Sequence, residues 1–509
     1  MKKVTQRAAI ALLTMLLPIF TGASTGSGSH IRHVLVVSVD GLHAVDVRKF
    51  EKLAPESTMA WLARNGVEYT HANTPSPADS FPGLLALFTG GTPAATGVYY
   101  DVSYDRHLSP ANSHCHRVGT VVVYDESADA LNERAGDPLL DARRLPRDPK
   151  GCHPVFPHSY LRVNTVFEVV RRHAGYTAWI DKHPVYEILN GPSGRGVEDL
   201  YTPEIGSNFN SPADRGRGKI TASISRTERY DASKVQAVIN EISGFSHDGR
   251  KKAPVPTVFG LNLQTLNVAQ KLSGYADAQG DFTAPLVAAL SGVDAELGKI
   301  VAALHTHKLL SATLIIVTAK HGNGPIDPHL LRHVDRRKLA STISAAAPGA
   351  LAWITSDHGA LIWLRDQTET ATVAHALEQA QNRLGIERVL YGTFLTRYFP
   401  APTVDSRSPD LVIVPKPGTI YAKAGSQKKM EHGGFLADDT HVALLVYNPA
   451  LRHAGASIDA PVSTTQVAPT ILQSLGISPL ELRAVAIQGT QVLPGESWAA
   501  LGPVRQAAH

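Results

Sequence analysis

The sequence predicts an α/β protein with a doubly wound, largely parallel sheet flanked by helices and a loop-rich insertion. Short, nearly continuous apolar runs, typical of strands buried on both faces, alternate with longer segments of helical periodicity. Several of these runs end directly in polar residues, at the strand ends where α/β proteins build their sites. The composition, 43% hydrophobic and 18% charged over 509 residues, is that of a globular chain.

The elements follow one another along the whole chain. The apolar runs predict strands at residues 31–40, 176–180, 255–263, 313–318, 411–414 and 442–446. Helices are expected directly after Ser80 and at residues 163–173, 286–304 and 465–475. The region near 185–252 is rich in Gly, Pro, Ser and charge, which predicts a surface insertion or a segment that covers the substrate.

The first 24 residues are typical of a secretory signal peptide. Lys2, Lys3 and Arg7 precede an apolar stretch at 8–20, and the small residues at 22–24 suit a cleavage site. A transmembrane anchor is the alternative, but the stretch is shorter than the roughly 20 residues that a span needs. We therefore expect a periplasmic or secreted protein without a membrane span, whose residues 31–509 form one catalytic domain.

Charge and cysteine content limit the partners and the compartment. The formal net charge of +4 falls to +1 when the three basic residues of the predicted signal are subtracted, so no nucleic-acid polymer is expected as a partner. Cys115 and Cys152 are the only cysteines, and an oxidising compartment favours a disulfide between them. Such a bond would close a polar loop near 101–160; two unpaired thiols are the alternative.

Ser80 is the candidate nucleophile. It stands between Asp79 and the turn 81–83, and an apolar helical run follows immediately. This order places a hydroxyl at the N-terminus of a helix, where free N–H groups and the helix dipole favour an anion such as a phosphate. The alternative is that Ser80 only caps the helix.

Candidate metal ligands lie at the ends of other predicted strands. Acidic and imidazole ligands around a hydroxyl are what metal-assisted phosphoryl transfer requires, because the metal lowers the pKa of the hydroxyl and neutralises developing charge. Each histidine alone, among 23 in the chain, is more simply a surface or core residue. Taken together, the candidate ligands are Asp40, Ser80, His321 and His432.

The order of motifs resembles the alkaline phosphatase superfamily, and within it the type I phosphodiesterase/nucleotide pyrophosphatase family. The motifs are VSVDGL at 37–42, S-F-P-G at 80–83, T-G-x-x-P-x-x-T-G at 89–97, TLIIVTAKHG at 313–322, EHGGF at 431–435 and VAPTILQSLG at 467–476. The resemblance covers most of the mature chain. It implies an alkaline phosphatase-like fold, a hydrolase of phosphoric esters, and zinc ions held partly by Asp40, Ser80, His321 and His432.

The chain departs from the family pattern at several ligand positions. Lys320 replaces the aspartate of Ser-Asp-His-Gly, and Leu266 and Gln270 replace the aspartate and histidine of the family's second ligand motif. Asp101 stands where the family has an asparagine that helps to hold the phosphoryl group. Zinc is therefore expected as one ion or two, with Lys320 contacting phosphate directly. Further pocket residues are expected at Asp101, Asp181, His183 and Gln270.

A literal Ser-Asp-His-Gly occurs at 356–359, but it does not follow the 313–318 strand, and we interpret it as a coincidence. The function predicted is an exported, metal-dependent phosphodiesterase or nucleotide pyrophosphatase that acts on small phosphate esters through a covalent Ser80 intermediate. Two alternatives remain: a non-catalytic member that binds a phosphorylated ligand, and an enzyme that uses one metal ion plus Lys320 on a different ester. Sulfatase action is disfavoured, because Leu84 stands where the sulfatase pattern needs arginine.

Overall fold

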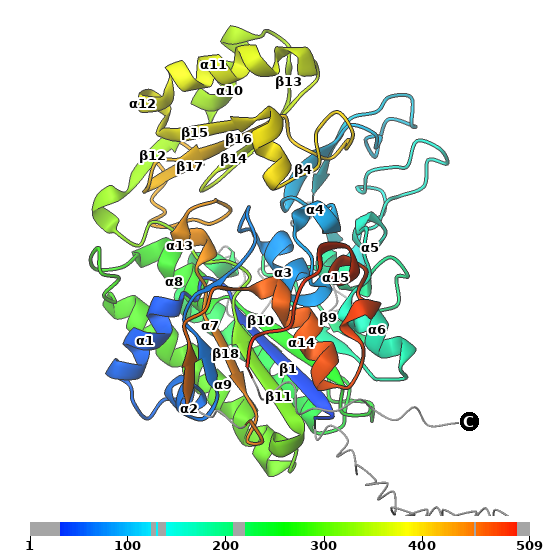
Figure 1. The fold of residues 1–509 in the computed structure, drawn as a ribbon, viewed down its shortest axis with the longest axis vertical. Helices are drawn as coiled ribbons and strands as arrows, with labels where there is room; N and C mark the ends of the chain where they lie inside the picture. The colour runs from blue at the N-terminus through cyan, green and yellow to red at the C-terminus, as the bar shows by residue number, and fades with distance from the viewer. Residues whose placement is uncertain (1–30, 124–128, 131–138, 207–218, 452–454, 496–509) are drawn as a thin grey trace, which may run out of the picture.

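The computed structural model describes residues 31–123, 129–130, 139–206, 219–451 and 455–495 and contains two main sheets (Figure 1). The larger sheet has eight strands in the order β19-β2-β18-β11-β1-β10-β8-β9. The run from β11 to β9 is parallel, which confirms the predicted fold class. Its strands are β11 (Thr313–Thr318), β1 (His33–Val39), β10 (Val258–Leu263), β8 (Ala178–Ile180) and β9 (Asp199–Tyr201). The other edge is mixed and consists of β18 (Leu444–Tyr447), β2 (Val67–Tyr69) and β19 (Ala456–Ile458).

Helices cover both faces of this sheet because successive side chains of a strand point to opposite sides. In β1, Val34 and Val36 belong to one apolar cluster, and Leu35 and Val37 belong to the other. The first cluster is completed by α3 (Ser80–Thr89), α6 (Val166–Arg172) and α14 (Val467–Ser474). The second is completed by α1 (Ala44–Leu53), α2 (Thr58–Asn65), α7 (Ile224–Ile242), α8 (Thr265–Ser273) and α9 (Ala284–Thr306).

A smaller unit stands beyond one end of the large sheet, at the top of Figure 1. Its antiparallel sheet has the order β13-β14-β16-β15 and packs on α10 (Arg337–Ala346) and α11 (Thr370–Gln379) through its own apolar cluster. The strands are β13 (Leu351–Ser356), β14 (Ala360–Leu364), β15 (Ile386–Tyr391) and β16 (Leu411–Pro415), and β12 (Arg332–Asp335) pairs with β17 (Thr419–Ala422) beside them. The strand predicted at 411–414 therefore exists, but it belongs to this second sheet.

The region near 185–252, where the sequence predicts helix and loop, contains two regular elements that belong to the large sheet and its helical layer. It supplies the edge strand β9 and the 19-residue helix α7, which packs on the large sheet through residues such as Val235 and Val238. Residues such as Tyr230, Val235, Val238 and Ile242 recur at helical spacing and are buried, so the apolar face was present in the sequence although charged residues lie between.

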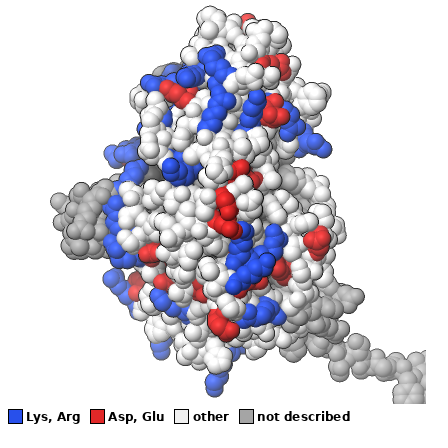
Figure 2. All heavy atoms as spheres, turned by 90° about the vertical axis from the view of Figure 1, so that its left-hand side faces the viewer, with Lys and Arg blue, Asp and Glu red and all other residues white. Residues whose placement is uncertain are grey.

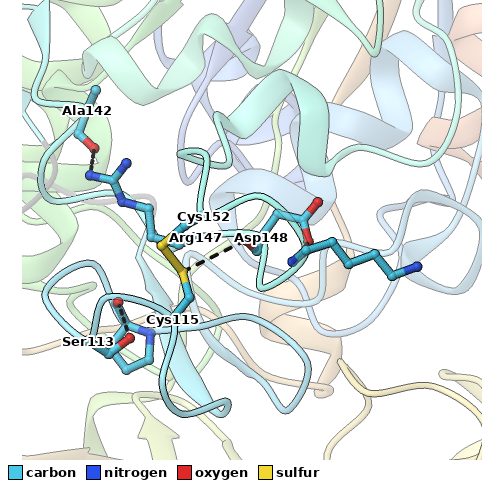
Figure 3. Close-up of a disulfide and its surroundings, with 8 residues drawn as sticks. Ser113, Cys115, Ala142, Arg147, Asp148 and Cys152 are labelled. Atoms are coloured by element: carbon cyan, nitrogen blue, oxygen red, sulfur yellow. Dashed lines mark hydrogen bonds between the residues drawn. A yellow bond between two sulfur atoms is a disulfide. The ribbon is translucent and has the colours of Figure 1, made fainter.

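The predicted disulfide is present in the polar loop. Cys115 and Cys152 are bonded, with their Cα atoms 5.8 Å apart, and the Cys115 sulfur faces the Asp148 carbonyl oxygen (Figure 3). In this loop β4 (Val102–Asp105) pairs with β5 (Thr120–Val123). The other short elements include α4 (Pro93–Thr96), α5 (Pro157–Tyr160), α12 (Gln381–Leu384), α13 (Ala437–Thr440) and α15 (Arg483–Gln488).

The face shown in Figure 2 carries basic and acidic side chains interspersed with uncharged ones. Among the described residues, no helix combines the length and the apolar character that crossing a bilayer requires. The predicted signal peptide, residues 1–24, lies outside the described residues.

Candidate active site

Three charged side chains follow the ends of parallel strands and meet at one edge of the large sheet. Asp40 follows β1, Lys182 follows β8 and Lys320 follows β11. The Lys182 Nζ atom lies 2.9 Å from Asp40 Oδ2, and the Lys320 Nζ atom lies 3.8 Å from Asp40 Oδ1. All three side chains are buried. The carboxyl edge of the sheet thus holds one carboxylate between two ammonium groups.

Asp40 is surrounded by donors. Asn262 Nδ2 donates to its Oδ1 atom at 2.7 Å, and Gln264 Nε2 donates to its Oδ2 atom at 2.6 Å. Burial alone raises the pKa of Asp40, but the ammonium groups of Lys182 and Lys320 outweigh burial and hold the pKa well below its usual range. Asp40 is therefore ionised, and its carboxylate is surrounded by ammonium groups and amide N–H donors.

Ser80 is the first residue of α3, and its hydroxyl faces this group. Asp79 occupies the N-cap position, so the alternative that Ser80 is only the cap is wrong. The helix can approach the sheet edge because residue 83 is glycine: a Cβ atom there would lie 2.0 Å from the Lys320 carbonyl oxygen. Ser80 Oγ lies 3.1 Å from Lys182 Nζ and 3.3 Å from His321 Nε2.

His321 is held in one orientation by its own loop. Its Nδ1 atom lies 2.9 Å from the Gly322 carbonyl oxygen, which can only accept, so Nδ1 carries the proton when the ring is neutral. Burial lowers the pKa of His321 despite the neighbouring Asp40 carboxylate, which favours that neutral form. The unprotonated Nε2 atom then presents its lone pair to the Ser80 hydroxyl.

Lys320, the residue that replaces the family aspartate, pairs with a second carboxylate. Its Nζ atom lies 3.3 Å from Asp181 Oδ1 and 3.2 Å from the Tyr186 hydroxyl, and it also lies over the Tyr186 ring. Burial lowers the pKa of Lys320 to about 8, although Asp181 and Asp40 oppose that shift. Asp181, a predicted pocket residue, therefore belongs to the site as the counter-ion of Lys320.

A neutral network occupies the neighbouring space. The His432 ring stacks on the His321 ring at 3.7 Å, and its Nδ1 atom lies 3.1 Å from Asn323 Oδ1. The Asn323 amide nitrogen donates to Gln270 Oε1 at 2.5 Å and to Asn267 Oδ1 at 3.0 Å. Burial, together with the nearby His321, holds the pKa of His432 well below its usual range. Gln270, another predicted pocket residue, thus joins His432 through an amide network.

The donor set does not fit the pair of zinc ions that the resemblance implies. A zinc site takes three or four nitrogen, sulfur or oxygen donors. Asp40 and Ser80 are both hydrogen-bonded by the Lys182 ammonium, and around His432 the family's acidic ligand position is the buried, apolar Leu266. Among the residues that the structure describes, no group of three His, Cys, Asp or Glu side chains is arranged to hold a metal ion.

Two other predicted residues lie beside or outside this group. Asp101 donates its backbone N–H to Asp79 Oδ2 at 2.8 Å and lines a cavity of about 580 Å³ between β4 and β13. His183 points instead to Glu204, at 2.8 Å, because it follows Lys182 directly and neighbouring side chains diverge. Asp101 therefore borders the site, whereas His183 is paired outside it.

The Ser-Asp-His-Gly copy at 356–359 forms the turn between β13 and β14 and is not at the end of a strand of the large sheet. It nevertheless supports the site, because His358 N–H donates to the His432 carbonyl oxygen at 3.1 Å. The His358 ring bonds Asp439 at 2.8 Å through Nδ1, and its buried Nε2 atom has no hydrogen-bond partner among the described residues.

Sequence reasoning placed Lys182 in a polar cluster at a strand end without giving it a role, and it missed Asn262 and Gln264. Lys182 is the second residue after its strand, as Lys320 is after β11. This shared position could have indicated that both lysines belong to the site. Asn262 and Gln264 are two residues apart at the end of β10, a spacing that directs both side chains to one side.

Comparison with known proteins identifies the family and the fold of the chain. A model of the type I phosphodiesterase/nucleotide pyrophosphatase family matches residues 34–435. Murine ectonucleotide pyrophosphatase/phosphodiesterase 5 has a similar structure, with a TM-score of 0.56 and 16% identity over 88% of this chain and 96% of that chain. The inactive T72A form of the murine protein, in complex with AMP, has a TM-score of 0.55 and 14% identity over 88% of this chain and 96% of that chain. The human protein has a TM-score of 0.55 and 15% identity over 88% of this chain and 95% of that chain.

The sequence has no significant match among curated proteins. The solved structures support an alkaline phosphatase-like fold, and the family model extends over most of the chain. Members of this family generally depend on divalent metals such as zinc. The chain belongs to the type I phosphodiesterase/nucleotide pyrophosphatase family and is a hydrolase of phosphoric ester bonds.

Proposed function

We propose that the protein hydrolyses small phosphodiesters through a covalent phosphoseryl intermediate on Ser80. The observation that supports this most directly is the position of the Ser80 hydroxyl, which is at the start of α3 and within 3.3 Å of both Lys182 Nζ and His321 Nε2. A nucleophile needs a group that can remove its proton and a positive charge that stabilises the developing anion. Both are in contact with Ser80.

Hydrolysis then proceeds in two displacements at phosphorus. Ser80 Oγ attacks, the Oγ–P bond forms, and the bond to the leaving oxygen breaks in line with it. Water attacks the phosphoseryl group in the second step, and the Oγ–P bond breaks to regenerate the serine. In both steps His321 and Lys182 are the groups in contact with the Ser80 oxygen.

A cavity that Asp101 borders supports a diester with a flat organic substituent, and Asp101 is hydrogen-bonded to Asp79, the residue before Ser80. The cavity is lined by Trp353, Arg336 and Arg337, which offer an aromatic ring and positive charge, and by the carboxyl groups of Asp101 and Asp357. A fold neighbour of this chain has been solved in complex with AMP. We therefore propose nucleotide-like or aryl phosphodiesters as the substrate class.

The test is turnover of bis-p-nitrophenyl phosphate by Ser80→Ala. We expect a fall of at least about 10³-fold in kcat, because the nucleophile is removed. Thr89→Ser, at the other end of the same helix, is the matched control and keeps full turnover. Trapping of a phosphoseryl peptide by rapid acid quench, read by mass spectrometry, identifies the residue. Turnover by Ser80→Ala within tenfold of the unsubstituted chain would end the assignment.

We also propose that the protein is exported, as the predicted signal at residues 1–24 indicates. The disulfide in the described loop supports an oxidising compartment. Cell fractionation with N-terminal mass analysis tests this: a cytoplasmic, unprocessed chain would contradict it.

A further inference from the structure

The Lys182 ammonium has the surroundings of a bound cation. Its three N–H donors have three oxygen acceptors: Asp40 Oδ2 at 2.9 Å, Ser80 Oγ at 3.1 Å and Gln264 Oε1 at 3.5 Å. Two of these partners, Asp40 and Ser80, are the residues that were expected to share a metal ion. A covalently attached cation therefore already bridges the carboxylate and the nucleophile.

The amides around Asp40 are oriented for this arrangement. Gln264 Nε2 donates to Asp40 and also lies 2.5 Å from Asn262 Oδ1, while its Oε1 accepts from Asn267 Nδ2 at 3.3 Å. Both amide nitrogens nearest Asp40 are thus donors, and an amide N–H cannot ligate a cation. Asp40 is arranged as the counter-ion of an ammonium group.

The cluster already contains its own cations. Two ammonium groups, Lys182 and Lys320, face the carboxylates of Asp40 and Asp181, and all four are buried; the buried Asp79 carboxyl group also acts on Lys182. A divalent ion placed among them would lie within a few ångströms of two cations, in surroundings of low dielectric. The arrangement therefore disfavours an additional metal ion.

His321 supplies what a metal would otherwise supply to the hydroxyl. A metal activates a hydroxyl by lowering its pKa. Here the Nδ1 contact with Gly322 fixes the tautomer whose Nε2 atom can accept the Ser80 proton, 3.3 Å away. The Lys182 ammonium, in contact with the same oxygen, stabilises the alkoxide character that develops as the proton leaves.

From these contacts we propose that the chain hydrolyses its phosphodiester without a metal ion, with the ammonium groups of Lys182 and Lys320 in place of the family's metal charge and His321 as general base. This inference rests on the proposed function. In the first displacement the proton of Ser80 passes to His321 Nε2 and from there to solvent, and the leaving oxygen departs as an anion that water protonates. In the second, His321 accepts a proton from the attacking water and returns it to Ser80 Oγ.

The first experiment removes metals from the full-length protein. The purified chain is dialysed against EDTA and dipicolinate, its metal content is measured by plasma mass spectrometry, and bis-p-nitrophenyl phosphate turnover is followed before and after addition of zinc, manganese or calcium. We expect far less than one ion per chain, an unchanged kcat, and no rise in Tm with zinc. Loss of turnover on chelation and its return with zinc would overturn the inference while leaving the proposed function intact. No turnover under any condition would overturn both.

The second experiment replaces the ammonium group. The turnover of Lys182→Ala is expected to be about 10²- to 10³-fold lower than that of the unsubstituted chain. Added methylammonium is expected to raise the turnover of the variant at least about tenfold. Tetramethylammonium, which has no N–H to donate, is expected to restore no turnover. Zinc is also expected to restore no turnover. Lys299→Ala, an exposed lysine on α9, is the control for the substitution. Circular dichroism confirms that Lys182→Ala folds. Rescue by zinc, or no rescue by any amine, would overturn the inference.

Discussion

The site has two halves that compensate for lost ligands in opposite ways. The charged half consists of Asp40, Asp181, Lys182 and Lys320; it keeps positive charge beside the nucleophile and neutralises it with carboxylates. The amide half consists of Asn267, Gln270, Asn323 and His432; these uncharged side chains hydrogen-bond to one another, and carboxylates lie beside only His432. Both halves lie where the family resemblance places metal ligands. The charged half includes Lys182, the ammonium group that contacts Ser80, so we expect the first half to govern turnover and the second to govern stability.

We expect the largest loss of turnover from Lys182→Met, which removes the ammonium charge and keeps a side chain of similar size. Turnover is expected to fall about 10²- to 10³-fold, because the ammonium that contacts Ser80 is removed. The free energy of unfolding should fall by about 3–5 kcal/mol, because the buried Asp40 carboxylate loses its closest cation. Both are measured on the same samples, by kcat and by urea unfolding.

The double variant Asp40→Asn/Lys182→Met is the matched control for this prediction. It removes both charges of the pair, so it should recover most of the lost stability without recovering turnover. If turnover returned together with stability, Lys182 would be only a structural counter-ion, and the charged half would have no special role.

The second prediction uses the pH dependence of Lys320. Its ammonium faces Asp181, Asp40, Lys182 and Tyr186, and burial lowers its pKa from 10.5 to about 8. Turnover should therefore decline as the pH rises through about 8, because positive charge is lost from the site. Stability should move the other way: between about 8 and 10.5 the unfolded chain binds more protons at this lysine than the folded chain, so the free energy of unfolding rises with pH.

Lys320→Met is the comparison that isolates this group. We expect its turnover to be lower and to lack the decline near pH 8, and we expect its unfolding free energy to lack the rise between pH 8 and 10.5. Parallel pH profiles for Lys320→Met and the unsubstituted chain would assign the titration to another residue.

The strands that precede Asp40 and Lys320 were predictable because parallel strands buried on both faces leave uninterrupted apolar runs. The antiparallel β13–β16 sheet was not: the runs at 360–364 and 411–414 look like strands in the sequence, but nothing in either run indicates that the two pair with each other in a separate sheet. Side-chain direction was the other missing information. Lys182 and His183 are adjacent, yet one enters the site and the other pairs with Glu204, and residue types alone do not reveal which.

Substitutions in the amide half should have the smallest effect on turnover. They therefore test most directly whether the two halves of the site have different roles. Gln270 donates to the Gly41 carbonyl oxygen at 2.8 Å and accepts from Asn323, and neither partner contacts Ser80 in the structure. Gln270→Ala should therefore lower the free energy of unfolding by about 1–3 kcal/mol, because buried partners lose hydrogen bonds, and should change kcat by less than about threefold.

Ser273→Ala, on the same helix α8 but outside the amide half, is the control and should change neither quantity by much. A loss of turnover in Gln270→Ala as large as that in Lys182→Met would show that the amide half positions His321 through the stacked His432 ring. The two halves would then act as one catalytic unit. A loss of stability alone would instead mean that a family ligand position has become part of the core, because a neutral, satisfied hydrogen-bond network needs no ion to balance it.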